Sequence, residues 1–152
     1  MNAINFYRAG RWLYVHHIPI LPKLIKGITY LFFNSVVPYT AEIGKGSKFA
    51  YGGIGSVVHS RAKIGDRVII GQNSTIGRSL DPEDIPTIGN DVYISAGVRI
   101  VGKIHIGNNV IIGANAVVCK DVDDNCIVAG VPAKIIRRID IPIWDLLKNI
   151  KF

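Results

Sequence analysis

Aliphatic residues recur at every sixth position between Ile88 and Val118. This spacing fits neither an amphipathic helix, whose apolar residues recur at shorter intervals, nor a series of hairpins, which need turn dipeptides. It is typical of hexapeptide repeats that wind into a β-helix. In such a coil the repeated aliphatic residue and the fifth residue of each repeat point inward. The residues expected inside are Ile88, Ile94, Ile100, Ile106, Ile112 and Val118, together with Val92, Val98, Ile104, Val110, Ala116 and Val122.

The repeats begin near Val37, and three of them form one triangular coil with three short parallel strands. Two segments break the period. Between Phe49 and Val58 the pattern slips across the glycine-rich string YGGIGS. Residues 78–87 carry prolines and acidic residues without an interior pattern, so we expect an external loop there. Because function is often placed where a rigid scaffold is irregular, both segments are candidate parts of a site.

Residues 1–36 follow another pattern, being aromatic, basic and free of acidic residues. Pro19 and Pro22 divide them, so we expect helices near residues 4–16 and 23–33. These helices would cover the open end of the solenoid or contact a neighbouring subunit. The alternative is peripheral attachment to an anionic membrane, since no apolar run approaches the length of about 20 residues that crosses a bilayer. In that arrangement the apolar side would hold Phe6, Trp12, Leu13, Leu31, Phe32 and Phe33, and the basic side Arg8, Arg11, Lys23 and Lys26.

The pattern divides the chain into an N-terminal helical cap of residues 1–36, a β-helix of residues 37–136 and a C-terminal capping segment of residues 137–152. In the last segment we expect a short helix with Trp144, Leu147 and Ile150 on one face. The chain has two cysteines, Cys119 and Cys126, which give neither a disulfide framework nor a metal spacing. No secretory signal is evident. We therefore expect a cytoplasmic protein, with membrane attachment as an option.

The formal net charge of +7 is compatible with nucleic acid, an anionic membrane or a phosphate-bearing ligand. The basic residues are scattered among the repeats, and no nucleic-acid recognition motif is present. Charge therefore favours a polyphosphate ligand or an acidic surface over nucleic acid. A zinc enzyme of the carbonic-anhydrase type would need three converging imidazoles. The solenoid offers His59 and His105 alone, on faces that are not equivalent, so no metal is expected.

Three strings carry a family resemblance: VVHSRAKIGDRVIIGQNSTIG, IGNDVYISAGVRIVGKIHIGNNVIIGANAVVCKDV and VAGVPAKIIRRI. They resemble the hexapeptide-repeat acyltransferases, and most nearly the serine acetyltransferases and the sugar O-acetyltransferases of surface-polysaccharide pathways. The resemblance implies an all-β solenoid wound as a left-handed parallel β-helix. It also implies acetyl-CoA as donor and a homotrimer whose active sites lie between subunits.

Acetyl transfer to a hydroxyl needs a base to accept the proton and donors to stabilise the oxyanion. Histidine suits the base role at neutral pH. His59 directly follows the irregular YGGIGS segment, at a corner that a small residue normally occupies, so it is the candidate catalytic base. A purely structural corner histidine is the alternative. His16 and His17 belong to the N-terminal cap, and His105 is expected on an outward coil face.

Serine acetyltransferases carry one histidine in a glycine-rich string and another before a proline in the following loop. At the corresponding positions this chain has Tyr51 and Ile85, and its solenoid opens with VPYT instead of an acidic and histidine-proline pair. The sequence therefore favours a hydroxyl of a sugar or glycan precursor as acceptor, in surface polysaccharide biosynthesis. The alternatives are a serine O-acetyltransferase of cysteine biosynthesis and a non-catalytic trimeric scaffold.

The resemblance also implies a donor site. Ala96, Gly97 and Ala114 match small residues that let the pantetheine arm approach the backbone. Basic positions of the family, which are suggested to bind the nucleotide phosphates, correspond to Lys120, Lys134 and Arg137. Without a ligand, the small residues would serve corner geometry and the basic residues would solubilise the end of the solenoid.

Overall fold

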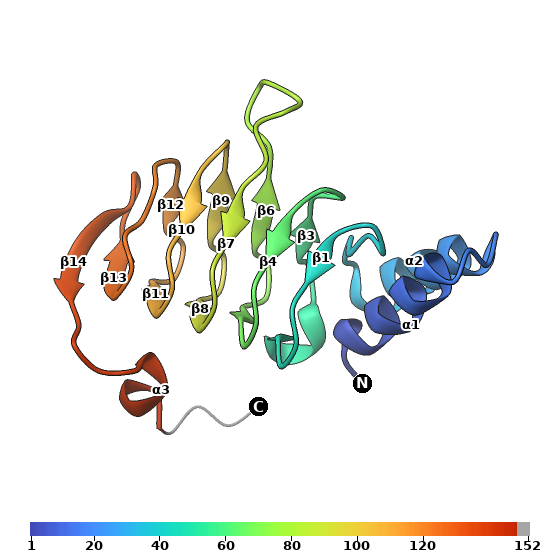
Figure 1. Ribbon diagram of the computed structural model, residues 1–152, viewed down its shortest axis with the longest axis horizontal. Coiled ribbons are helices and arrows are strands. Elements are labelled where there is room, and N and C mark those ends of the chain that lie inside the picture. Colours follow the sequence, from blue (N-terminus) through green and yellow to red (C-terminus); the bar gives the residue numbers. More distant parts are fainter. Residues whose placement is uncertain (149–152) are drawn as a thin grey trace.

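The computed structural model describes residues 1–148 and shows a solenoid of short strands with two helices across one end (Figure 1). The helices are α1 (Ala3–Val15) and α2 (Leu21–Phe33), so both expected helices are present within two residues of their predicted limits. The strands of the solenoid are β1 (Glu42–Ile43), β2 (Lys48–Phe49), β3 (Val57–Val58), β4 (Lys63–Ile64), β5 (Ile69–Ile70), β6 (Thr75–Gly77), β7 (Thr87–Ile88), β8 (Val92–Ile94), β9 (Arg99–Val101), β10 (His105–Ile106), β11 (Val110–Ile112), β12 (Val117–Val118), β13 (Cys126–Ala129) and β14 (Lys134–Arg138).

The strands form three sheets, one for each side of the coil. Sheet A has the order β12-β9-β6-β3, sheet B the order β1-β4-β7-β10, and sheet C the order β14-β13-β11-β8-β5-β2. Neighbouring strands are parallel except β14, which runs antiparallel to β13. In the regular part, Ile94 pairs with Ile112 and Ile88 with Ile106, so each coil repeats the register of the one before. The parallel three-sided solenoid is as predicted.

The interior is filled by the residues that the period of six places there. Ile94, Ile100, Ile106 and Ile112 are fully buried, and the fifth-position residues from Val92 to Val122 are buried as well. Burying an aliphatic side chain of this size contributes roughly 1.5–3 kcal/mol, so the stacked aliphatics hold successive coils together.

Corner glycines set how closely the coils approach. A Cβ atom on Gly65 would lie 2.5 Å from the carbonyl oxygen of Gly89, and one on Gly89 would lie 2.9 Å from the carbonyl oxygen of Gly107. Both distances are shorter than a carbon–oxygen contact, so the small residue is required by the stacking itself. This requirement holds whether or not a ligand binds.

Helix α1 covers the first coil. Covering the open end of the solenoid was one of the roles that the sequence predicted for the N-terminal helices. The hydroxyl of Tyr7 donates to the carbonyl oxygen of Ala41 at 2.8 Å and accepts from the amide of Ile43 at 3.0 Å. The Asn2 side chain donates to the carbonyl oxygen of Phe49 at 2.8 Å. Within residues 1–148, no helix is both long and apolar enough to cross a bilayer.

The C-terminal segment departs from the expectation. β14 adds an antiparallel strand that the repeats did not indicate, and helix α3 is a single turn, Ile143–Leu146. The indole of Trp144 donates to Asp91 Oδ1 at 2.8 Å, whereas Leu147 follows the helix, and Ile150 lies outside the described residues.

Candidate active site

The turns between the sheets form long edges of the solenoid. Residues 59–62, 78–86, 102–104 and 119–121 connect sheet A to sheet B, and we refer to them as the A–B edge. Residues 50–56, 71–74, 95–98 and 113–116 connect sheet C to sheet A and form the C–A edge. The two irregular segments of the sequence therefore lie on different edges, since 50–56 belongs to the C–A edge and 78–86 to the A–B edge.

His59 lies on the A–B edge, immediately after β3. Its amide donates to the carbonyl oxygen of Ile76 in the next coil at 2.8 Å, and its own carbonyl accepts from the amide of Ala62 at 3.0 Å. These bonds fix the backbone, and the side chain is only partly buried. Burial lowers the pKa of the imidazole below 6.5, and the positive charges of Arg61 and Arg78 lower it further. The ring is therefore predominantly neutral at pH 7.

The hydrogen bonding of the ring determines which nitrogen carries the proton. Nδ1 of His59 accepts from the amide of Arg61 at 3.2 Å. A neutral imidazole that accepts at Nδ1 carries its proton on Nε2. Nε2 in this geometry is a hydrogen-bond donor, and it becomes a proton acceptor once the ring gives up the Arg61 amide and takes the other tautomer.

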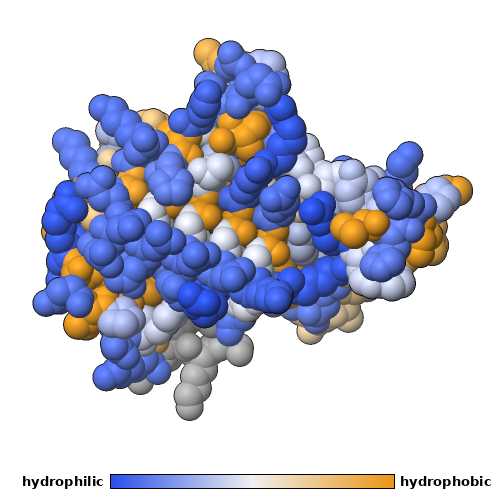
Figure 2. Space-filling model, viewed as in Figure 1, coloured by the Kyte–Doolittle hydropathy of each residue, from blue (hydrophilic) through white to orange (hydrophobic). Residues whose placement is uncertain are grey.

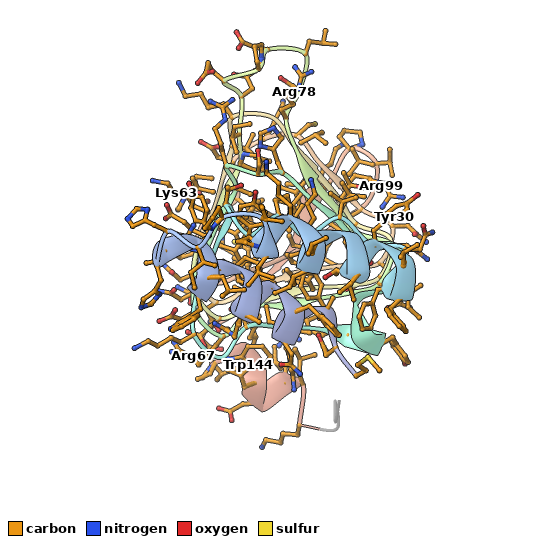
Figure 3. All side chains as sticks on the ribbon, turned by 90° about the vertical axis from the view of Figure 1, so that its right-hand side faces the viewer. Tyr30, Lys63, Arg67, Arg78, Arg99 and Trp144 are labelled. Atoms are coloured by element: carbon orange, nitrogen blue, oxygen red, sulfur yellow. The ribbon has the colours of Figure 1, made fainter. Side chains whose placement is uncertain are left out.

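Arg61 links His59 to the loop of residues 78–86. Its guanidinium donates to both carboxylate oxygens of Glu83, at 2.8 and 3.0 Å, and also to the carbonyl oxygen of Pro82. Figure 1 shows this loop projecting from the solenoid, and Figure 3 shows it extending beyond Arg78. Arg61 was not among the residues predicted from sequence. The sequence does show an arginine near His59, one coil before the acidic loop. Its pairing with Glu83, however, depends on the conformation of the loop.

The loop is ordered by its own side chains and by one apolar contact. Ser79 donates to Asp84 Oδ2 at 2.6 Å, and the amide of Glu83 donates to Asp81 Oδ1 at 2.8 Å. Ile85 is partly buried and packs against the core. Its side chain therefore anchors the end of the loop. The loop spans residues 78–86, because Thr87, which the sequence assigned to it, is the first residue of β7.

Tyr51 lies at the other end of β3 from His59, in a turn of 3-10 helix (Ala50–Gly53) on the C–A edge. Its φ of 48° is left-handed, and its side chain is 73% exposed. The sequence predicts an acceptor pocket built from Tyr51–Ser56, the 78–87 loop and a neighbouring subunit. Within one protomer the structure separates the two segments by the width of sheet A, because β3 runs from one edge to the other.

The residues assigned to the donor lie mainly on the C–A edge. The amide of Asn115, next to Ala114, donates to the carbonyl oxygen of Ala96 at 2.9 Å, so Ala96, Gly97 and Ala114 occupy successive turns of this edge. Lys134 pairs with Ala129 between β14 and β13. Ala129 in turn lies against Gly113, since a Cβ placed on Gly113 would be 2.9 Å from the Cβ of Ala129. Lys134 is therefore close to this group, whereas Arg137 lies further along β14, opposite Ile127.

Lys120 is placed elsewhere, on the A–B edge with His59. Of the other histidines, His105 is exposed on sheet B, with Nδ1 3.0 Å from Thr87 Oγ1, as the sequence predicted for an outward position. Within residues 1–148, no three histidine, cysteine or acidic side chains converge as metal ligands.

Residues 85–120 match the family profile described as bacterial transferase hexapeptide (six repeats). The chain is 34% identical over 147 residues to a serine acetyltransferase of Synechococcus elongatus, a match that covers 95% of this chain and 60% of the relative. It is 32% identical over 166 residues to the serine acetyltransferase of Staphylococcus xylosus, covering 99% of this chain and 76% of that protein.

Solved structures give the same result. The crystal structure of a Brucella abortus serine acetyltransferase in complex with coenzyme A superposes with a TM-score of 0.84 at 31% identity, covering 91% of this chain and 56% of that chain. The chain thus spans about 60% of the length of the first curated relative. These relatives overturn the expectation of a sugar or glycan acceptor in surface polysaccharide biosynthesis, because they are named serine acetyltransferases. That expectation gave too much weight to Tyr51 and Ile85.

Proposed function

Because this chain belongs to the serine acetyltransferase family of hexapeptide-repeat transferases, we propose that it transfers an acetyl group from acetyl-CoA to the side-chain hydroxyl of serine. This was the alternative expectation from the sequence. A serine O-acetyltransferase of this kind would act in cysteine biosynthesis. The left-handed winding of the coils is part of the proposal and is supported by the likeness to solved serine acetyltransferases.

The observation that carries the proposal is the arrangement at the A–B edge. A neutral, partly buried histidine lies beside a projecting acidic loop, and Arg61 joins the two. A neutral imidazole can accept a proton at pH 7, and the loop can enclose a small polar acceptor. We assign His59 as the catalytic base.

In the proposed reaction, the serine hydroxyl oxygen attacks the thioester carbonyl carbon while its proton moves to Nε2 of His59. The C–S bond then breaks, and the CoA sulfur takes the proton from the imidazolium. For Nε2 to accept, the ring must release the Arg61 amide, which costs about 1 kcal/mol for one neutral hydrogen bond. The hydrogen bond that the hydroxyl of a serine held against the loop donates to Nε2 offsets this cost.

The two edges imply an assembly. His59 and Lys120 lie on the A–B edge, whereas Ala96, Gly97, Ala114 and Lys134 lie on the C–A edge. A homotrimer would bring the A–B edge of one copy against the C–A edge of the next. Each site would then take its base from one subunit and the wall of its pantetheine groove from another. Lys120, Lys134 and Arg137 would bind the nucleotide phosphates from the two sides.

The chain departs from the family at two positions that matter for this mechanism. Tyr51 and Ile85 stand where the family has histidines, so neither position supplies an imidazole to accept the proton. His59 is the one solenoid histidine on the A–B edge within the described residues. The proposal therefore places the whole base function on this residue.

A direct test measures the loss of thioester absorbance when purified protein is mixed with acetyl-CoA and L-serine. Monitoring the thioester avoids reagents that would label the exposed thiol of Cys119. We expect serine-dependent turnover, with L-alanine as the control that lacks the hydroxyl. Binding of acetyl-CoA without turnover would show that the chain is a non-catalytic scaffold and would refute the proposal.

A further inference from the structure

Helix α2 presents an apolar stripe to solvent that the solenoid does not cover. The exposed fractions are 56% for Leu24, 39% for Ile28, 80% for Leu31 and 67% for Phe32. These residues recur at helical spacing, so they lie along one face. The opposite face packs on the rest of the protein through Pro22, Thr29 and Phe33, which are buried. Figure 2 shows apolar surface at this end of the molecule.

The charge of the same end has one sign. No acidic residue occurs before Glu42, whereas residues 1–41 contain Arg8, Arg11, Lys23 and Lys26. The two arginines are engaged with the protein, since Arg8 donates to the carbonyl oxygen of Gly44 and Arg11 to those of Tyr39 and Thr40. Lys23 and Lys26 are exposed on α2 and form no ion pair within the described residues.

A hollow of about 520 Å³ lies beside the stripe. It is lined by both lysines together with Gly27 and Tyr30 of α2, and by Ser35, Val36 and Tyr39 of the segment that follows. Figure 3 shows Tyr30 on the end of the molecule that the two helices cover. Two ammonium groups and two phenol hydroxyls are suitable donors for a phosphate oxygen.

We propose that this end of the protein docks on an anionic phospholipid surface. Helix α2 lies in the plane of the membrane, with Leu24, Ile28, Leu31 and Phe32 at the boundary between headgroups and acyl chains. Lys23 and Lys26 contact lipid phosphates, one of which enters the hollow. The surface does not require a spanning helix, and the inference is independent of the acetyl transfer proposed above.

Charge complementarity favours a membrane over a second copy of the chain. Two copies joined through α2 would bring their lysines together, with no acidic residue in either segment to compensate them. Each lysine near an anionic membrane surface contributes about 1 kcal/mol, and this attraction is screened by salt. An anionic membrane thus satisfies both the apolar stripe and the lysines.

The test is co-sedimentation of the full chain with vesicles of phosphatidylcholine alone and of phosphatidylcholine with phosphatidylserine. We expect binding to the mixed vesicles that is roughly 30-fold stronger than to the neutral ones, from two lysines at about 1 kcal/mol each, and weaker at 0.5 M salt. Lys23→Gln with Lys26→Gln should abolish the preference for phosphatidylserine. Leu31→Ser with Phe32→Ser should remove binding to both. The matched controls, Lys103→Gln and Ile136→Ser, alter exposed residues outside this end and should bind as the wild type does.

Two results would overturn the inference. Wild-type protein that fails to sediment with either vesicle would exclude the membrane as the occupant. Alternatively, if Leu31→Ser with Phe32→Ser reduced the number of subunits measured by light scattering while vesicle binding stayed at the wild-type level, the stripe would be a subunit contact. Circular dichroism of each variant distinguishes these outcomes from unfolding.

Discussion

The guanidinium of Arg61 holds the carboxylate of Glu83 through two hydrogen bonds, at 2.8 and 3.0 Å, across a separation of 22 residues in the chain. The amide of the same arginine donates to the ring of His59. One residue thus joins the candidate base to the loop that would hold the acceptor. The position of the loop relative to the imidazole follows from this pair.

Glu83→Gln removes the charge of the pair and keeps its shape. Both side chains are exposed, so the free energy of unfolding should change by less than about 1 kcal/mol. The loop would lose its attachment near His59, and kcat/KM for serine should fall roughly tenfold, because small displacements of a reacting group are costly. Steady-state kinetics and urea unfolding measure the two effects. Asp123→Asn, in the exposed pair with Arg138, is the control and should leave kcat/KM unchanged.

The pH dependence of activity should report the environment of His59. Burial, then Arg61 and Arg78, lower its pKa, so the acid limb of kcat/KM should have a midpoint below 6.5. Salt screens the two arginines but does not alter burial, so high salt should move the midpoint only part of the way toward 6.5. A midpoint above 6.5 would contradict the assignment.

The same shift affects stability, and its sign is opposite to that of a paired histidine. The unfolded chain binds a proton on His59 at a higher pH than the folded chain does. The contribution to stability is therefore complete above pH 6.5 and is lost as the pH falls through the folded-state pKa. Denaturant unfolding between pH 8 and pH 5 measures this effect. On acidification the free energy of unfolding should fall further for the wild type than for His59→Ala, which lacks the imidazole.

Two glycine substitutions should act in opposite directions. A Cβ on Gly65 would lie 2.5 Å from the carbonyl oxygen of Gly89, so Gly65→Ala must push the coils apart and should lower the free energy of unfolding by about 1–3 kcal/mol, as overpacking does. Around a Cβ on Gly27 nothing lies within 4 Å, so Gly27→Ala should stabilise α2 by up to about 1 kcal/mol. Denaturant midpoints measure both, and a neutral Gly65→Ala would contradict the close stacking of the edge.

Lys134→Gln should weaken donor binding. Loss of one charge-assisted hydrogen bond to a phosphate corresponds to about 1.5–3 kcal/mol, so the KM for acetyl-CoA should rise at least tenfold while kcat is retained. Lys45→Gln, on the edge between sheets B and C, is the matched control. An unchanged KM for Lys134→Gln would remove this residue from the donor site.

The interior of the solenoid could be predicted because the repeat determines it. A residue such as Ile100 is buried whenever the six-residue step continues, whatever the turns contain. The pairing of Arg61 with Glu83 could not be predicted in the same way, because it depends on the conformation of a loop that obeys no period. Gly65 shows that the stacking of the coils by itself requires a small residue at a corner.

The spatial arrangement of the candidate residues was harder to predict from the sequence than their identity. Tyr51 and His59 are close in sequence, yet β3 carries the chain across sheet A between them, so the predicted pocket would need the neighbouring subunit to bring the two segments together. Ile85 stands where the resemblance implies a histidine, and in the structure its side chain packs against the core at the end of the loop. Distance along the chain is a poor guide to position in a solenoid where each turn of the coil changes sheet.

The kinetic effect of His59→Asn tests the central assignment most directly. Asparagine is polar and of similar size but cannot take up a proton at neutral pH, so kcat with acetyl-CoA and L-serine should fall by about 10²–10⁴-fold while acetyl-CoA still binds. His105→Asn, on an exposed face of sheet B, should retain full activity. If His59→Asn turned over serine at the wild-type rate, His59 would be a structural corner residue and the proposed mechanism would be wrong.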